Sequence, residues 1–539
     1  MPRRPGATAG TRSVADDLRR WRENAGPPGA AVVVADAGGL VDVMTDGLAD
    51  MERKIALRAD HRFEIGSISK SLTAIAVLRA AERGRLELHD PVHRLLPWFR
   101  AGPRTAGITI HHLLTHTGGI PNGGDASDAS AFDVWALRDA DVLPPGTGYW
   151  YSNAGYKALG LLAATAADAP FPSVLQREAL EAFGMDDALP SVRRCDRDRA
   201  AVGYEPEPFA YPRSLARRVP APEIEITMGD GSVAATPQDM GHYAVGLLRM
   251  LAGSGNEAAS PLGPASIAAL TGRHVRTGPG KWYGYGLGIR HGQGGWTIGH
   301  GGDTLGFGAS LLCDPTAGLA VVVLANLRAA PTRDLARHVL AARVAARAGL
   351  PAPVFEPPRS AIIPAASRRF SGPAGQIILG LDSRGPYVER DGASRRLIDR
   401  GGDRFEVDDP RMGRYLMRFE SSAGRPTRVV HGPDVFRGEG AGGSRFAPVR
   451  GAVARPRGDA FLGAYHTHNP WRRAVDVLRR DGRLILVEDD GEEAELVHLG
   501  SGRFRIGRER NPERMTFDAV VDGRALRATA GGVPLVRRD

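Results

Sequence analysis

The chain has 539 residues, of which 42% are hydrophobic and 24% charged, and this length and composition predict a globular protein with two or three domains. No run of about 18 apolar residues occurs, and no apolar stretch follows the basic first residues, so we expect neither a membrane span nor a secretory signal, and a cytoplasmic location. Two cysteines argue against a disulfide framework or a zinc site, and the net charge of +9 comes from arginines spread among acidic residues, which does not favour nucleic-acid binding.

The first part of the chain alternates predicted helices with buried strands. Strands are predicted over residues 30–35, 41–44, 309–313 and 319–327. Helices are predicted over residues 14–24, 67–83, 154–167, 237–251 and 333–347. Strands at both ends with helices between them indicate one α/β (α+β) domain over residues 1–349, whose sheet joins its N- and C-terminal segments.

Beyond a proline-rich linker at residues 351–358, the pattern changes to short alternating strands separated by glycine turns. A faint repeat runs through this part, because residues 397–407 resemble residues 496–506, about 90 to 100 positions later. Each copy has the length of one small β-domain. We therefore expect two antiparallel β-barrels or sandwiches, over residues 359–450 and 456–539.

The strongest chemical signal is a serine followed three residues later by a lysine, Ser67 and Lys70, at the start of a predicted helix. Positions i and i+3 share a helix face, so a neutral Lys70 amine could reach the Ser67 hydroxyl and take its proton. The chain has only four lysines, and a lysine where arginine would otherwise serve suggests that a titratable amine is needed. Taken alone, the pattern leaves a solvated helix lysine equally open.

A second signal is Tyr151 with Asn153, which follow a turn rich in proline and glycine. A phenol beside a cationic amine ionises more readily and can serve as general base and acid. An amide two residues further on could point into the same cleft and hold a substrate carbonyl. The alternative, which is favoured when the motif is taken alone, is a buried tyrosine and an asparagine that caps the next helix.

The third signal is His300 followed by Gly301, Gly302 and Asp303, just before a predicted strand pair. Two glycines let a substrate approach the backbone closely. Taken alone, the motif would more often be a glycine-rich hairpin with a histidine that faces the solvent.

Together and in this order, the three motifs resemble those of the penicillin-recognising serine hydrolases. That family comprises class C β-lactamases, DD-peptidases, D-aminopeptidases and related esterases, and its pattern is Ser-x-x-Lys, then Tyr-x-Asn, then Lys-Thr-Gly or His-x-Gly. Two further segments, Ile108 to Gly119 and Gly229 to Asp239, fit the same family, and the resemblance covers about residues 10–345.

The resemblance implies a role for each matched residue. Ser67 would be the acylated nucleophile, and Lys70 and Tyr151 would exchange its proton and protonate the leaving group. The oxyanion hole would combine the N–H of Ser67 with that of Asp303. Asn153, Gly301 and Gly302 would bind the substrate. His300 would be the catalytic residue of the third motif. No cofactor is implied, and His111, His112 and His116 would be structural.

The third motif departs from Lys-Thr-Gly. Gly301 supplies no hydroxyl and His300 is only partly charged near neutral pH, so recognition of a free substrate carboxylate should be weak. His-Gly-Gly is similar to the motif of D-aminopeptidases and several esterases. A D-aminopeptidase also resembles this chain in having two small β-barrels after its catalytic domain. By that analogy the acidic stretch Glu488 to Glu493 could face a substrate ammonium, although a solvated turn is the commoner explanation.

We therefore predict a serine hydrolase that forms an acyl-enzyme from amides or esters of small amino-acid or short peptide substrates, D-configured ones included. One alternative is acyl transfer to an amine, because standalone cyclases that release nonribosomal peptides from a carrier or thioester resemble this family. A second alternative is a binding protein without catalysis on the same scaffold. No sequence feature indicates a metal, a nucleic acid or a membrane as partner.

Overall fold

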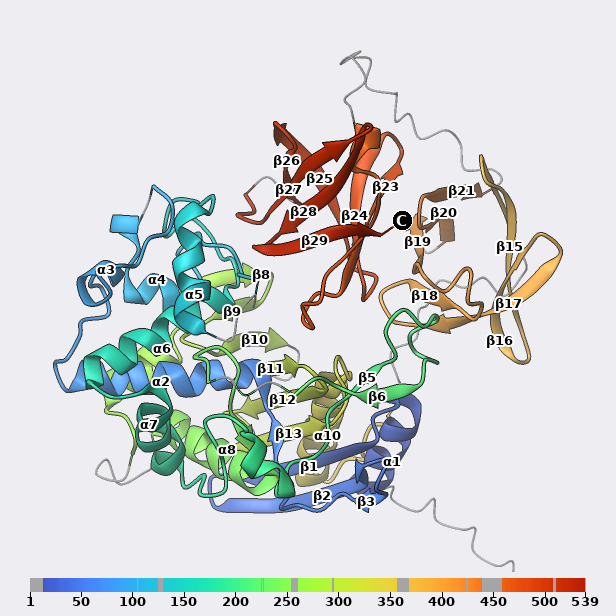
Figure 1. Cartoon of the computed structure of the whole chain (residues 1–539). Coiled ribbons are helices and arrows are strands. Elements are labelled where there is room, and N and C mark those ends of the chain that lie inside the picture. Colours follow the sequence, from blue (N-terminus) through green and yellow to red (C-terminus); the bar gives the residue numbers. More distant parts are fainter. Residues whose placement is uncertain are drawn as a thin grey trace, which may run out of the picture. The chain divides into compact units, whose positions relative to one another are not determined.

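The computed structural model describes residues 13–103, 105–124, 129–223, 225, 227–253, 260–292, 295–355, 368–422, 425–438, 458–507 and 510–538. Two compact units divide the chain (Figure 1). The first consists of Met1–Gly123, Ser127–Glu205 and Pro220–Phe355. The second consists of Gly124–Ala126, Pro206–Val219 and Glu356–Asp539. The sequence analysis did not separate Pro206–Val219 from the first part of the chain, and the domain boundaries it gave stay predictions.

A nine-stranded antiparallel sheet forms the centre of the first unit, in the order β3-β2-β1-β13-β12-β11-β10-β9-β8 (Figure 1). Its strands are β1 Gly29–Asp36, β2 Gly39–Asp50, β3 Ile55–Ala56, β8 Val275–Gly278, β9 Lys281–Tyr283, β10 Gly288–Gly292, β11 Gly295–Thr304, β12 Phe307–Asp314 and β13 Leu319–Ala325. Two short strand pairs lie outside this sheet, β4 Phe63–Glu64 with β7 Ala234–Ala235 and β5 Tyr204–Pro206 with β6 Arg218–Pro220.

Strand β1 pairs with β13 along its length, with Val32 opposite Val323, so the sheet joins the two ends of the unit as predicted. Successive side chains of a strand point to opposite faces, and here both faces are buried. Val32 belongs to a core formed with Trp21 and Leu335. Val33 belongs to the larger core on the other face. The uninterrupted apolar run of β1 follows from this two-sided burial.

Helices cover both faces of the sheet (Figure 1). The α-helices are α1 Val14–Ala25, α2 Ser69–Glu82, α3 Val92–Leu95, α4 Ile110–Leu114, α5 Ser130–Trp135, α6 Asn153–Ala167, α7 Phe171–Leu175, α8 Pro237–Ala252, α9 Pro264–Leu270 and α10 Thr332–Arg347. Shorter helical turns are η1 Gly66–Ile68, η2 Thr105–Gly107, η3 Ala136–Asp139, η4 Gln176–Leu180, η5 Glu181–Phe183, η6 Arg194–Arg199 and, in the second unit, η8 Gly458–Phe461. All five predicted helices are confirmed. Thr236 caps α8, as a threonine before a proline at the first helical position predicts.

The second unit contains two closed antiparallel barrels, which confirms the predicted fold class of an α/β domain followed by two small β-barrels. The first barrel consists of β14 Arg368–Gly372, β15 Gly375–Asp382, β16 Gly385–Arg390, β17 Ala393–Asp399, β18 Arg404–Val407, β19 Met417–Ser422, β20 Arg425–His431 and β21 Asp434–Gly438. The second consists of β22 Gly463–His466, β23 Ala474–Arg480, β24 Arg483–Glu488, β25 Glu493–Gly500, β26 Arg503–Ile506, β27 Arg514–Val521, β28 Arg524–Ala530 and β29 Val533–Arg538. The sequence repeat has a structural basis, since β18 and β26 are the fifth strands of their barrels and each buries a phenylalanine, Phe405 and Phe504.

The acidic stretch between β24 and β25 is paired with arginines of the second unit. Glu488 lies 3.1 Å from Arg472, and Glu493 lies 2.6 Å from Arg480. Glu492 is paired with Arg404 in the same way. These three carboxylates are thus paired within the second unit, and a role of the stretch toward a substrate ammonium stays a prediction.

No single helix in the described parts of the chain is long and apolar enough to cross a membrane. One bent pair, Asn153–Ala167 with Phe171–Phe183, reaches that length and composition only when its two members are joined.

Candidate active site

Ser67 lies in the 3-10 turn η1, which leads into α2. Ile65 and Ile68 on either side of it are completely buried, whereas Ser67 is only partly buried. The Ile65 amide donates to the carbonyl of Val233 at 2.9 Å, just before β7. The two buried isoleucines thus hold the backbone of the turn while the Ser67 hydroxyl stays accessible.

Lys70 reaches the Ser67 hydroxyl one helical turn later, as the spacing predicted. Its side chain is completely buried, and Nζ lies 3.0 Å from Ser67 Oγ. The same nitrogen donates to Asn153 Oδ1 and to the carbonyl of Asp230, each at 2.8 Å. All three acceptors are uncharged oxygens, and none of them belongs to a carboxylate. Together they orient the amine toward Ser67.

Tyr151 completes the group around the nucleophile. Its hydroxyl donates to Ser67 Oγ at 2.7 Å, and its ring lies beneath the Lys70 amine, 4.8 Å from Nζ. Ser67 Oγ is thereby in hydrogen-bond contact with both groups that could take its proton, which is the geometry that a serine nucleophile requires. Tyr151, 84 positions after Ser67, thus meets Lys70 at one oxygen atom.

Asn153 is the first residue of α6, and Ser152 caps that helix with its hydroxyl. The Asn153 side-chain oxygen accepts from Lys70, so its amide nitrogen is the group that it can offer to a substrate carbonyl. The Asn153 backbone amide donates to Asn122 Oδ1 at 3.0 Å. Sequence reasoning missed Asn122, which has no motif around it that would indicate this role.

The glycines of β11 bring that strand against the Ser67 turn. A Cβ atom on Gly302 would lie 2.0 Å from the carbonyl oxygen of Ile65, and one on Gly66 would lie 2.8 Å from the amide nitrogen of Asp303. Gly66 also has a φ of +51°, which favours glycine. The Asp303 amide therefore lies next to the Ser67 turn, where the oxyanion hole was predicted. The Asp303 carboxylate accepts from the Ala329 amide at 2.6 Å.

His300 joins the group but does not carry the partial charge that was expected. Burial, followed by the charge of Lys70, lowers the pKa of His300 to about 3, so the ring is neutral. Its nitrogens contact the Tyr283 hydroxyl at 3.0 Å and the Gly301 carbonyl at 2.5 Å. Its ring centre is 6.1 Å from that of Tyr151. A direct catalytic role for His300 stays a prediction.

Two arginines beside the third motif were not predicted. Arg333 of α10 reaches Gly301, where a Cβ atom would lie 2.9 Å from Nη2. Arg290 of β10 lies near Arg333. Burial lowers the pKa of Arg290 most, and the positive charge of Arg333 lowers it further. Burial likewise lowers the pKa of Arg333, but a guanidinium remains charged at any ordinary pH. The guanidinium of Arg333 occupies the space that a larger residue than glycine would take at position 301.

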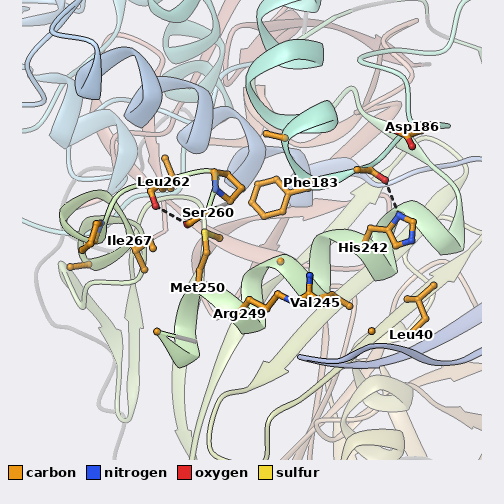
Figure 2. Close-up of a pocket in the computed structure, with 18 residues that line it drawn as sticks. Leu40, Phe183, Asp186, His242, Val245, Arg249, Met250, Ser260, Leu262 and Ile267 are labelled. Carbon is orange, nitrogen blue, oxygen red and sulfur yellow. Dashed lines mark hydrogen bonds between the residues drawn. The ribbon is translucent and has the colours of Figure 1, made fainter. Parts of the chain in front are cut away.

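A separate pocket of about 990 Å³ lies between α8, α9 and the start of β2. Figure 2 shows its lining, which includes Leu40, Phe183 and Arg249 and none of the three residues around the Ser67 oxygen. Within the residues that the structure describes, no group of three or more His, Cys, Asp or Glu side chains is arranged to hold a metal ion.

Comparison with known proteins agrees with this geometry. Residues 14–346 match the β-lactamase family model, so the chain belongs to this family, the penicillin-recognising serine hydrolases. It is 33% identical over 237 residues to the esterase EstB of Burkholderia gladioli, a match that covers 40% of this chain and 56% of the esterase. It is 28% identical over 228 residues to penicillin-binding protein 4* of Bacillus subtilis (strain 168), which covers 39% and 50%.

The chain thus spans about half the length of these curated relatives. Among solved structures, an octameric penicillin-binding protein homologue from Pyrococcus abyssi shares the fold, with a TM-score of 0.60 and 22% identity. That match covers 79% of this chain and 98% of the homologue.

Proposed function

We propose that the protein is a serine hydrolase that cleaves amides or esters of small substrates through an acyl-enzyme on Ser67. The observation that carries this proposal is the convergence of the Lys70 amine and the Tyr151 hydroxyl on the Ser67 oxygen, at 3.0 and 2.7 Å. Relatives named an esterase and a penicillin-binding protein support the same class of chemistry.

The reaction follows from these contacts. The Tyr151 oxygen when ionised, or the Lys70 amine when neutral, takes the Ser67 proton as Oγ attacks the substrate carbonyl. The amides of Ser67 and Asp303 stabilise the resulting oxyanion, and Asn153 holds the substrate amide through its nitrogen. The leaving amine or alcohol takes this proton from the group that received it, Tyr151 or Lys70, as the bond to carbon breaks. Water then attacks the acyl-enzyme by the same route in reverse, which restores Ser67.

The substrate class includes molecules with an anionic group near the third motif. The sequence alone predicted weak recognition of a carboxylate because Gly301 has no hydroxyl. The positive charge that the neutral His300 does not supply is present instead on Arg290 and Arg333, which lie beside the same strand. We therefore include amino-acyl and short peptide esters with a free carboxylate, of both L and D configuration, among the candidate substrates.

The experiment that tests the acyl-enzyme is labelling with a fluorophosphonate probe, read by intact mass and peptide mapping. One adduct on Ser67 is expected in the wild type and in Ser69→Ala, whose buried hydroxyl accepts from the Val233 amide. No adduct is expected in Ser67→Ala. An unlabelled wild type, or labelling that survives in Ser67→Ala, would contradict the proposal. A peptide thioester then separates hydrolysis from acyl transfer, because one gives a linear acid and the other a macrocycle.

A further inference from the structure

The Tyr283 hydroxyl lies between two histidines that come from different parts of the chain, the buried His116 and the partly buried His300. It is 3.2 Å from His116 Nε2 and 3.0 Å from His300 Nε2. His116 and Tyr283 are almost completely buried, with exposed fractions of 2% and 4%. Burial lowers the pKa of both histidines, that of His300 to about 3 and that of His116 well below its usual value. Each ring is therefore neutral and carries a single N–H.

Backbone groups fix which nitrogen carries that proton. The Ser152 amide donates to His116 Nδ1 at 3.0 Å, so His116 must carry its proton on Nε2. The Gly301 carbonyl can only accept, and it lies 2.5 Å from His300 Nδ1, so His300 must carry its proton on Nδ1. Tyr283 then accepts from His116, and its one proton can be donated to His300. The two histidine assignments are compatible, because one hydroxyl can accept from His116 and donate to His300 at the same time.

Tyr156 is a further polar neighbour of Tyr283, since the two side chains form a hydrogen bond. Tyr156 donates its own proton to the Leu114 carbonyl at 2.7 Å, so toward Tyr283 it can only accept, and it shares the Tyr283 proton with His300. Lys70 lies 5.6 Å from the Tyr156 ring. The Lys70 charge is also a cause of the lowered pKa of both histidines. A cation nearby disfavours a second proton on either ring, so the neutral forms persist across the ordinary pH range.

The chain of hydrogen bonds connects the tyrosine motif with the third motif. His116 holds the backbone on both sides of Tyr151, because its carbonyl accepts from the Trp150 amide at 2.9 Å and its Nδ1 accepts from Ser152. The His116 ring also lies 4.4 Å from the Tyr151 ring. At the other end, His300 lies on β11 three residues before Asp303, whose amide faces the Ser67 turn.

We propose that His116 and Tyr283 are positioning residues, which through His300 set the distance between the Tyr151 phenol and the oxyanion-binding edge of β11. This inference rests on the proposed function, since it assigns these residues to the same reaction. The chain of bonds does not reach Ser67 as a proton path, because the nitrogens of His300 are used by Tyr283 and Gly301. Its effect is to hold two parts of the site in register.

The first test is the tautomeric state of the two rings in the wild-type protein, read from 15N signals of labelled histidine and assigned by their loss in His116→Asn and His300→Asn. We expect opposite tautomers, Nε2–H on His116 and Nδ1–H on His300, unchanged from pH 8 to pH 5. The same tautomer on both rings, or a titration of either ring in that range, would overturn the proposal. This measurement needs no activity.

The second test compares Tyr283→Phe with Tyr285→Phe. Tyr285 is a matched control, because its hydroxyl also contacts a histidine, His111 Nδ1 at 2.7 Å, outside the proposed chain. We expect Tyr283→Phe to lower kcat about 10- to 100-fold with KM changed less than about 3-fold, and to give His300 a mixture of tautomers. Tyr285→Phe should leave both readouts unchanged.

The outcomes separate this inference from the proposed function. Equal losses of kcat in the two variants, or an unchanged His300 tautomer in Tyr283→Phe, would refute the positioning role while Ser67 is still labelled. A wild type that the fluorophosphonate leaves unlabelled would refute the hydrolase assignment, whatever tautomers the histidines adopt.

Discussion

Replacing Tyr151 by phenylalanine tests the assignment of the proton-transfer group most directly. The change removes one oxygen, the atom that lies 2.7 Å from Ser67 Oγ, and leaves the ring that lies 4.4 Å from His116. The Lys70 amine keeps its own contact with Ser67 at 3.0 Å. The substitution therefore separates the contribution of the phenol from that of the amine.

The expected loss follows from what the oxygen does. A positioned general acid–base group contributes roughly 10²- to 10⁴-fold, which corresponds to about 3 to 5.5 kcal/mol of activation free energy. The free energy of unfolding should change by only about 1 kcal/mol, since one hydrogen bond is lost and the ring packing is kept. Activity and stability should thus respond very differently.

Stopped-flow acylation by a p-nitrophenyl ester measures the effect, with urea unfolding as the stability readout. Tyr149→Phe is the matched control, because Tyr149 is also partly buried and its ring lies beside His116, at 5.7 Å between ring centres. We expect the control to acylate within about 3-fold of the wild type. If Tyr151→Phe also acylates at that rate, the phenol is not the proton-transfer group and the reasoning fails.

Three other substitutions or conditions test separate features. Arg333→Ala should lower kcat/KM about 10-fold for an ester with a free carboxylate, and should change it little for a neutral ester. Substitution of the exposed Arg337 by alanine is the control. Equal losses of kcat/KM on both esters would contradict an anion-binding role for Arg333. Lys157→Met should lower the free energy of unfolding by about 3–5 kcal/mol, because the buried Asp133 carboxylate loses the ammonium that lies 2.5 Å away. The double variant Lys157→Met with Asp133→Leu should regain most of this stability in urea unfolding. Burial lowers the pKa of His111 to about 4, so below pH 6.5 the unfolded chain binds a proton that the folded protein does not. The free energy of unfolding should therefore fall from pH 6.5 to pH 4, by less than about 1.4 kcal/mol per pH unit because the ring is partly exposed. His111→Gln should flatten this slope in urea titrations.

The sequence predicted those parts of the site whose chemistry is local. Ser67 and Lys70 are one helical turn apart, so their contact follows from helix geometry once the helix is recognised. The family pattern added Tyr151 and Asn153, and both reach the Lys70–Ser67 pair. In the same way, the apolar run of β1 predicted a buried strand, and the structure buries it on both faces.

The parts that sequence reasoning missed depend on register between distant strands. Tyr283 ends a three-residue strand with no pattern around it, and its position beside His300 is fixed only by the pairing of β9, β10 and β11. The resemblance of its segment to the family placed His116 among structural residues, and nothing in the sequence linked it to Tyr283. Arg333 lies on a predicted helix, but its contact with Gly301 exists only because the motif has a glycine there.

The distribution of the four lysines supports the idea that an amine was kept at position 70 for its chemistry, and it also limits that idea. Lys54 and Lys281 are exposed, where arginine would serve as well. Lys157 is as deeply buried as Lys70, but it lies against a carboxylate, so its burial is explained by an ion pair. Burial of a lysine is therefore not the distinguishing property. What sets Lys70 apart is that the described contacts of its amine are uncharged oxygens, one of which is the serine hydroxyl, and a guanidinium could not give up a proton there.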